Sequence, residues 1–332
     1  MLNPNLKLNP KIFNEDVEQV SIRKGFGQGL LLAGETDENV VALCADLTES
    51  TQMIFFKEKF PKRFVEVGVA EQNLVTIASG MAAMGKIPFC SSYAIFNPGR
   101  NWEQIRTTIA YNDRPVKIVG SHGGISVGPD GGTHQALEDI ALMRVVPNMD
   151  VLSPCDAIEA KKITLAITKT GKPAYLRLAR EKTPIITTEE TPMQIGKAEI
   201  FWMPDMGLAQ VGIIATGGLL YRAIIAAKEL EAEGIKIKVM NLSSIKPIDN
   251  NAIIALAKEC KAIVTVEEHQ IAGGIGSAAA EILAQNFPVP IEFIGVRDKF
   301  GQSGTPDELI EHYGMGKDSI KEAVRKVLMR KI

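Results

Sequence analysis

The sequence predicts an α/β protein of two domains, each a mainly parallel sheet flanked by helices. Its 332 residues exceed the usual size of a single domain. Short apolar runs rich in β-branched residues alternate with longer helix-like segments, as βαβ units require. One segment rich in Thr, Pro and Glu, EKTPIITTEETPMQIGKAEIFWMPDMG (181–207), interrupts this alternation. It therefore predicts a domain boundary near residue 190.

The segments before this boundary carry strand and helix patterns in turn. IRKGFGQGLLLAGE (22–35) is predicted to be a helix, and NVVALCAD (39–46) a buried strand that ends in an acid. RFVEVGV (63–69) predicts a strand, and AEQNLVTIASGMAAMG (70–85) an Ala-rich helix. The remaining predicted elements are a helix at 101–112 and strands at 86–94, 114–124, 150–156 and 173–180.

The same alternation resumes after the boundary. It predicts strands at 211–218, 235–245 and 262–269, and helices at 219–234, 250–260 and 271–285. The expected organisation is an N-terminal arm at 1–20, a first domain at 21–185, a linker at 186–194 and a second domain at 195–332.

Composition narrows the class of protein. A chain that is 45% hydrophobic and 23% charged is ordinary for a globular protein with sizeable cores. Its net charge of −2 gives no electrostatic case for binding nucleic acid or an anionic membrane. No apolar run is long enough to span a bilayer. The four cysteines lie far apart without metal-ligand spacing, which predicts reduced thiols and a cytoplasmic protein.

The first residues, MLNPNLKLNPKIFNEDVEQ (1–19), are polar and contain two Asn-Pro pairs. They lack the apolar core of a signal peptide or a membrane anchor. We expect an extended arm.

Polar residues gather just after the first-domain strands. In a parallel sheet the carboxyl ends of the strands share one edge, where ligands collect. The segments expected to converge there are 46–50, 68–73, 92–100 and 121–134.

Glu71, in FVEVGVAEQN (64–73), stands where a strand gives way to a helix. The helix macrodipole alone would explain a carboxylate there. However, the helix is apolar or small nearly all round, so it is predicted to be buried. A buried carboxylate is costly unless it is paired. Beside a cleft, such a glutamate could exchange a proton with a bound ligand.

The segment SHGGISVGPDGGTHQALED (121–139) holds two of the four histidines, His122 and His134. Its glycines indicate that the backbone approaches something closely. It lacks the GxSxG nucleophile, the Lys-Ser/Thr of a phosphate loop and a third metal ligand. Two neutral histidines that contact hydroxyls or relay protons fit the pattern, and ordinary turn histidines fit it equally.

Two further segments are weaker signals on their own. Tyr93, Phe96 and Arg100 follow a strand, although aromatic residues are more often core and arginines more often surface charges. Asp46 and Ser50 lie in ADLTES (45–50), where a capping cluster is an adequate explanation. These residues are expected at the same edge of the sheet as Glu71 and the histidines, and this common location favours a functional site.

Together these segments resemble the C-terminal half of a transketolase. ADLTES resembles the Ala-Asp-Leu-Thr segment of the family, and GVAEQN its Gly-x-x-Glu-His/Gln motif. GPDGGTHQALEDIA resembles the Gly-x-Asp-Gly-Pro-Thr-His-Gln signature, with Gly132 in place of proline. VEEHQIAGGIGSAAAE resembles the start of a helix in the C-terminal domain. The resemblance covers nearly the whole chain and implies a thiamine diphosphate pyrimidine-domain fold followed by a transketolase C-terminal domain.

The resemblance implies a role for each candidate residue near the cofactor, thiamine diphosphate. Glu71 would share its proton with N1′ of the aminopyrimidine and favour the imino tautomer, so that the neighbouring nitrogen can remove the C2 proton and form the carbanion. Tyr93 and Phe96 match aromatic residues that pack on the pyrimidine, and Asp46 matches an acid near the thiamine.

It also implies substrate contacts. His122 and His134 match histidines that touch sugar hydroxyls or phosphate and help proton transfer, and Ser50 matches a contact to the substrate phosphate. The familiar transketolases have a phosphate-binding arginine before Pro-x-Asp, where this chain has Ser153. Arg100 is the expected substitute, because 1-deoxyxylulose 5-phosphate synthases resemble the chain there. Weaker candidates are Arg177 and Arg180.

The diphosphate half of the site is missing from the sequence. The Gly-Asp-Gly…Asn motif that binds the diphosphate and its metal does not occur. The resemblance therefore implies a split enzyme, whose separate N-terminal subunit holds the diphosphate and Mg²⁺ or Ca²⁺. This chain would dimerise within a heterotetramer, bind no metal itself and be inactive alone. A truncated chain is the other explanation.

The implied activity is transfer of a two-carbon ketol unit from a ketose phosphate to an aldose phosphate, as in the pentose phosphate pathway. Three alternatives stay open: a 1-deoxyxylulose 5-phosphate synthase-like fragment, a 2-oxo acid dehydrogenase beta subunit, and a non-catalytic binding protein on the same fold. The second domain is expected to serve assembly. His269 and the Gly-rich helix start beside it form either an anion site or a tight packing contact.

Overall fold

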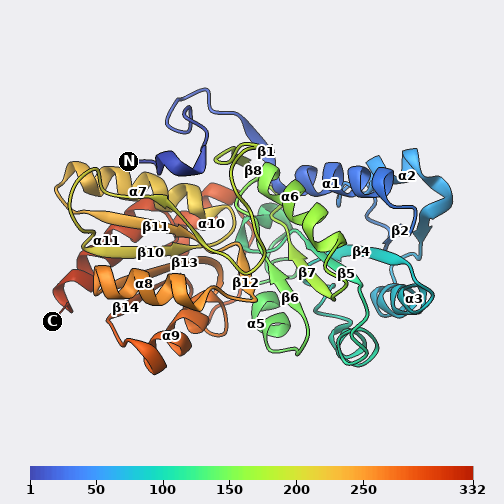
Figure 1. The fold of residues 1–332 in the computed structure, drawn as a ribbon. Helices are drawn as coiled ribbons and strands as arrows, with labels where there is room; N and C mark the ends of the chain where they lie inside the picture. Colours follow the sequence, from blue (N-terminus) through green and yellow to red (C-terminus); the bar gives the residue numbers. More distant parts are fainter. Residues whose placement is uncertain (332) are drawn as a thin grey trace.

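The computed structural model describes residues 1–331 and shows two α/β lobes side by side (Figure 1). The first is built on a seven-stranded sheet of order β12-β6-β7-β5-β4-β2-β3, parallel except for β12. Its strands are β2 Val40–Cys44, β3 Phe64–Glu66, β4 Ile87–Tyr93, β5 Lys117–Ser121, β6 Asp150–Leu152, β7 Ala174–Arg177 and β12 Ser244–Lys246. The predicted fold class is confirmed.

Helices cover both faces of this sheet. They are α1 Ile22–Thr36, α2 Ile54–Lys59, α3 Glu71–Ala83, α4 Trp102–Gln104 with a π-helical continuation Ile105–Ala110, α5 Asp139–Arg144 and α6 Ala157–Thr168. Glycines let α1 lie directly on α6. A Cβ on Gly25 would come within 1.8 Å of the Ala157 carbonyl oxygen, and one on Gly29 within 2.8 Å of Thr164.

The second lobe has a five-stranded sheet of order β14-β13-β10-β11-β9, in which only β9 is antiparallel. Its strands are β9 Glu199–Trp202, β10 Val211–Ala215, β11 Ile237–Asn241, β13 Ile263–Gln270 and β14 Ile291–Val296. Its helices are α7 Leu219–Ala232, α8 Asn250–Cys260, α9 Ile275–Asn286, α10 Pro306–His312 and α11 Lys317–Met329.

The strand expected over 235–245 is wrong as a single element. It splits into β11, in the second sheet, and β12, which pairs antiparallel with β6 of the first sheet. Buried side chains turn the chain between them: the Asn241 amide donates to Glu159 Oε1 at 2.8 Å. The Ser243 carbonyl then accepts the Ser153 N–H at 2.8 Å. The second domain thus contributes a strand to the sheet of the first.

The expectation of an extended arm is only partly met: the arm contains a short 3-10 helix, Pro4–Leu6, and turns over residues 10–16, and it is packed against the rest of the chain. Asn3 N–H donates to the Phe201 carbonyl at 2.9 Å, and Leu6, Leu8 and Ile12 are buried. Figure 1 shows the first residues beside α7 of the second domain, before the chain crosses to the first domain. There β1, Gln19–Ser21, pairs antiparallel with β8, Lys182–Pro184. The predicted boundary near residue 190 falls between β8 and β9, and the exact linker bounds remain a prediction.

The expectation that the helix after Glu71 is buried nearly all round is wrong. In α3 one face is buried, with Leu74, Val75 and Ala78, whereas Thr76 and Gly80 are exposed. None of the helices in residues 1–331 combines the length and apolar character needed to cross a bilayer.

Candidate functional site

The four predicted segments meet at one edge of the first sheet. Strands β3, β2, β4 and β5 are consecutive neighbours, so the loops that follow them lie side by side. Two non-glycine residues at this edge, Asp46 and His122, adopt left-handed backbone conformations with φ of 59°. Such conformations are uncommon for residues other than glycine, and they gather at functional sites.

Glu71 is the first residue of α3, and only 2% of its surface is exposed. Its Oε1 accepts a hydrogen bond from Ser92 Oγ at 3.0 Å, and its Oε2 accepts one from Arg100 Nη1 at 2.9 Å. Its backbone carbonyl accepts the Asn101 amide at 2.9 Å. The buried carboxylate is therefore paired, as its burial demands.

Two asparagines that the sequence analysis missed, Asn97 and Asn101, hold the loop after β4 in place. Asn97 Nδ2 donates to the carbonyls of Cys90 at 3.1 Å and Val119 at 3.3 Å. Its Oδ1 accepts Asn101 Nδ2 at 3.1 Å, and both residues are fully buried. The spacing of four residues between two asparagines in an otherwise loop-like segment is the signal that could have revealed them.

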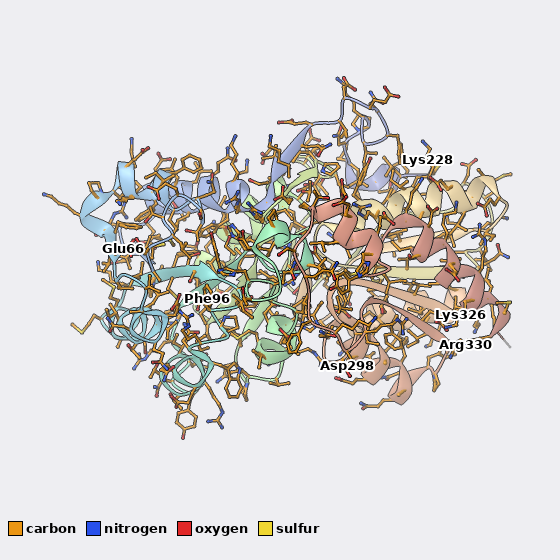
Figure 2. The ribbon with its side chains drawn as sticks, turned by 180° about the vertical axis from the view of Figure 1, so that it is seen from behind. Glu66, Phe96, Lys228, Asp298, Lys326 and Arg330 are labelled. Atoms are coloured by element: carbon orange, nitrogen blue, oxygen red, sulfur yellow. The ribbon has the colours of Figure 1, made fainter. Side chains whose placement is uncertain are left out.

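Aromatic rings connect Arg100 to both predicted histidines. The Arg100 guanidinium carbon lies 4.3 Å from the centre of the Phe96 ring, and Phe96 meets His134 edge-on at 5.5 Å. The Tyr93 and His122 rings stack at 4.0 Å. Figure 2 labels Phe96 on the first domain. Glu71, Arg100, the two aromatic rings and the two histidines thus form one continuous cluster.

His122 is buried, and its Nδ1 lies 2.8 Å from Ser121 Oγ. Burial lowers the pKa of His122 to about 3, and the nearby charges of Arg23, Arg180 and His134 act in the same direction. His122 is therefore neutral at physiological pH, and its ring can donate one hydrogen bond and accept another.

Arg23 is a functional candidate that the sequence analysis missed. Its Nη1 donates to the Ser50 carbonyl at 2.6 Å. Burial lowers the pKa of Arg23, and so does the charge of Arg180. A partly buried guanidinium with a second positive charge nearby favours a bound anion. A cation in the first turn of a helix opposes the macrodipole, and this is the signal that could have identified Arg23.

Some of the other predicted residues contact the cluster and others do not. Ser50 is linked to it by the hydrogen bond that its carbonyl accepts from Arg23. The Asp46 side chain is exposed, and only its backbone N–H is held, by Glu66 Oε1 at 2.7 Å. Arg177 packs against Gly123, next to His122, but its guanidinium is engaged in a buried ion pair with Asp139 at 2.8 Å. Ser153 is buried against the second domain.

The anion site considered beside His269 is not open. The carboxylate of Glu267 already fills the N-terminus of α9, where it accepts the N–H groups of Ile275 at 2.7 Å and Gly276 at 2.8 Å. A Cβ on Gly274 would come within 1.9 Å of Glu267 Oε2, so the glycines serve this packing. Burial raises the pKa of Glu267 to about 7 and lowers the pKa of His269.

A cleft of about 720 Å³ lies between the domains and away from the cluster. Its lining includes Glu181, Arg222 and Asp307, but none of the eight predicted site residues. Arg100 is exposed and Tyr93, Phe96 and His134 are partly exposed, so the cluster reaches the surface of the chain.

Comparison with known proteins places the chain in a family. Residues 18–185 match the transketolase pyrimidine binding domain, and residues 207–320 match the transketolase C-terminal domain. A putative transketolase C-terminal section of Methanocaldococcus jannaschii is 42% identical, over 93% of this chain and 96% of that protein. The 6-deoxy-6-sulfo-D-fructose transketolase subunit SqwH of a Clostridium species is 38% identical, over 96% of this chain and 98% of that protein.

Solved structures agree. A split gene transketolase, described as an inactive beta4 tetramer, superposes with a TM-score of 0.87 at 39% identity, over 94% of this chain and 100% of that one. The transketolase of Campylobacter jejuni gives a TM-score of 0.79 at 19% identity, over 95% of this chain but only 50% of that one, and shows the shared fold alone.

The two matched domains define a pyrimidine-binding chain of the thiamine diphosphate-dependent transketolase superfamily, and the chain belongs to the transketolase family. Within it, the chain corresponds to the C-terminal section that split-gene relatives carry as a separate protein.

The residues present fit one half of thiamine diphosphate. A buried carboxylate beside flat aromatic rings suits an aminopyrimidine, with Glu71 as the hydrogen-bonding group and Tyr93 and Phe96 as packing surfaces. Among residues 1–331 no cluster of three His, Cys, Asp or Glu side chains could hold a metal ion.

Proposed function

We propose that this chain is the pyrimidine-binding half of a two-subunit transketolase, which transfers a two-carbon ketol unit from a ketose phosphate to an aldose phosphate. The observation that carries the proposal is the Glu71 carboxylate, buried at the start of α3 and joined through Arg100 and Phe96 to the histidines. When bound, thiamine diphosphate supplies a carbon nucleophile for such a reaction.

Each side chain of the cluster has a task in this proposal. Glu71 holds a proton at N1′ of the pyrimidine, with Ser92 fixing the carboxylate. Tyr93 and Phe96 pack against the ring. His122, kept neutral by its surroundings, and His134 contact the sugar hydroxyls and move protons to and from the substrate oxygen.

An anionic end of the substrate would bind at Arg23, Ser50 and Arg180. Arg180 is close enough to Arg23 for its charge to lower the pKa of Arg23. The relatives support substrates with such an end: one is named for 6-deoxy-6-sulfo-D-fructose, and a 36% identical subunit of Phocaeicola vulgatus is named for apulose 4-phosphate. A sulfonate and a phosphate both suit paired guanidinium groups. Arg100 can join them once it leaves Glu71.

The rest of the site would come from a separate N-terminal subunit that binds the diphosphate and Mg²⁺ or Ca²⁺. The cluster reaches the surface of the chain, which supports this division, as does the 34% identical human transketolase, of which this chain matches only 50%. We further propose that two copies of the chain form the core of a heterotetramer, that the chain alone is inactive, and that it acts in the cytoplasm.

The alternatives draw less support. The relatives named above are transketolase subunits, not 1-deoxyxylulose 5-phosphate synthases or 2-oxo acid dehydrogenases. The paired Glu71 and the connected histidines give no support to a binding protein that has lost its chemistry.

The deciding experiment is calorimetric titration of thiamine diphosphate with magnesium into the chain alone and into a mixture with a candidate N-terminal subunit. We expect negligible binding alone, magnesium-dependent binding in the mixture, and ketol transfer only there. Tight metal-dependent binding by the chain alone would contradict the division of the site. Binding in the mixture without ketol transfer would contradict the proposed reaction.

A further inference from the structure

A loop of the second domain lies directly on the loop that carries the two histidines. We call residues 122–135 the histidine loop and residues 300–306 the covering loop. A Cβ on Gly132 would come within 2.7 Å of the Gly301 carbonyl oxygen, and one on Gly131 within 2.6 Å of Ser303 Oγ. Asp298, just before the covering loop, lies near the border between the domains in Figure 2. The glycines of the histidine loop thus make room for the second domain.

One side chain joins the two loops. The amide of Gln135, a residue that is 3% exposed, donates one hydrogen bond to the Ile125 carbonyl at 3.0 Å and one to the Gln302 carbonyl at 3.0 Å. Two carbonyl acceptors fix which end of the amide is nitrogen. Ile125 lies three residues after His122, and Gln135 directly follows His134. Gln135 therefore ties the two ends of the histidine loop to each other and, through Gln302, to the second domain.

Gly301 makes this contact feasible. A Cβ at that position would lie only 1.7 Å from Gln135 Oε1. Any side chain there must displace the amide and with it both hydrogen bonds. The other end of the histidine loop is held by the same domain, because Glu268 accepts the Ser126 N–H.

We propose that Gln135 and Gly301 are positioning residues for the reaction, and that the second domain, beyond any part in assembly, sets where His134 lies. This inference rests on the proposed function for its kinetic consequences, but the position of His134 is observable without it. A reacting group displaced by about 1 Å can cost on the order of 100-fold in rate, so a small shift of the loop has a large effect.

The kinetic test compares Gln135→Ala, Gly301→Ala and the double variant in the two-subunit assembly, with Lys299→Ala, an exposed residue next to the covering loop, as control. We expect each single variant to lower kcat about tenfold or more, consistent with displaced catalytic groups. Cofactor affinity should stay close to that of the control, whereas a modest fall in Tm is expected for Gln135→Ala because two carbonyls lose their donor. The double variant should lose less activity than the product of the two single effects, because the shortest contact at Gly301 is with the glutamine side chain and only the contact with Ile125 Cδ1 at 2.7 Å remains without it.

The second test uses the histidine ring signals in NMR spectra, where only four histidines contribute. Gly301→Ala should move the His134 signal and leave that of His269, buried in the second domain, in place. Single variants within twofold of wild-type kcat, multiplicative effects in the double variant, or an unmoved His134 signal would each overturn the proposal. A wild-type assembly without ketol transfer would instead remove the proposed function, while the spectra would still decide whether the covering loop positions His134.

Discussion

Arg100 occupies the oxygen of Glu71 that Ser92 leaves free, at 2.9 Å, while its guanidinium rests on the Phe96 ring. An aminopyrimidine that shares a proton with Glu71 needs one of these two oxygens. Arg100 and the pyrimidine therefore compete for Glu71. Arg100 becomes available for the substrate only after its ion pair with Glu71 is broken.

Replacing Arg100 should accordingly separate cofactor binding from substrate binding. Arg100→Met should tighten thiamine diphosphate binding by the two-subunit assembly up to about fivefold, since a half-exposed ion pair contributes at most about 1 kcal/mol. It should raise the KM for the anionic sugar. Calorimetry and steady-state kinetics measure the two effects, with Arg106→Met, an exposed arginine nearby, as control. Weaker cofactor binding would show that Arg100 assists the pyrimidine instead.

Glu71→Gln should nearly abolish ketol transfer. The amide keeps the size of the side chain but cannot share a proton with N1′, and the loss of a positioned acid-base group typically costs about 100- to 10,000-fold. The measurement is kcat at saturating cofactor, with Glu103→Gln, an exposed carboxylate on α4, as control. Activity within tenfold of wild type would show that Glu71 has only a structural task.

Arg23→Gln should raise the KM for the anionic substrate about tenfold or more, because hydrogen bonds to charged groups contribute about 1.5–3 kcal/mol. The neighbouring Lys24 is exposed, so Lys24→Gln is the matched control. If both variants raise the KM equally, the effect is general electrostatic attraction and not a built anion site.

His122 should make the stability of the chain depend on pH. Its folded-state pKa of about 3 lies below the ordinary value of 6.5. Between these values the unfolded chain binds more protons, so stability falls as the pH falls below 6.5 and is fully present above it. From pH 7.5 to pH 5 the expected loss is about 2 kcal/mol.

His122→Asn should remove the contribution of His122 and leave that of the buried His269, since asparagine tolerates the left-handed backbone at position 122. Urea unfolding at several pH values compares it with wild type and with His312→Asn, which changes an exposed histidine. Equal pH dependence in all three proteins would mean that His122 is not protected from protonation in the folded chain.

Much of the fold follows from periodicity, because buried parallel strands and the helices between them differ in pattern. The turn at Asn241 to Ser243 cannot be predicted from periodicity, because an apolar segment has the same pattern whether it stays in one sheet or crosses from one sheet to another. The packing of the arm depends on contacts nearly 200 residues away, as between Asn3 and Phe201. Such long-range contacts cannot be predicted from the local sequence.

The candidate site shows the same division. Residues directly after strands, such as Glu71 and His122, are placed by the sheet order alone. Arg23 reaches the site from the start of α1, and Gln135 acts through a loop of the other domain. Both depend on how distant segments pack, so a pattern of neighbours along the chain could not reveal their roles.

Strand β12 has a consequence for dividing the protein. A cut in the linker near residue 190 would remove β12 from the first sheet and leave β6 as an unpaired edge. Exposed edges recruit strands from other molecules, so the isolated first half should aggregate. The two halves, although each resembles a complete domain, are expected to unfold as one cooperative unit, and the join between them is a poor place to divide the chain.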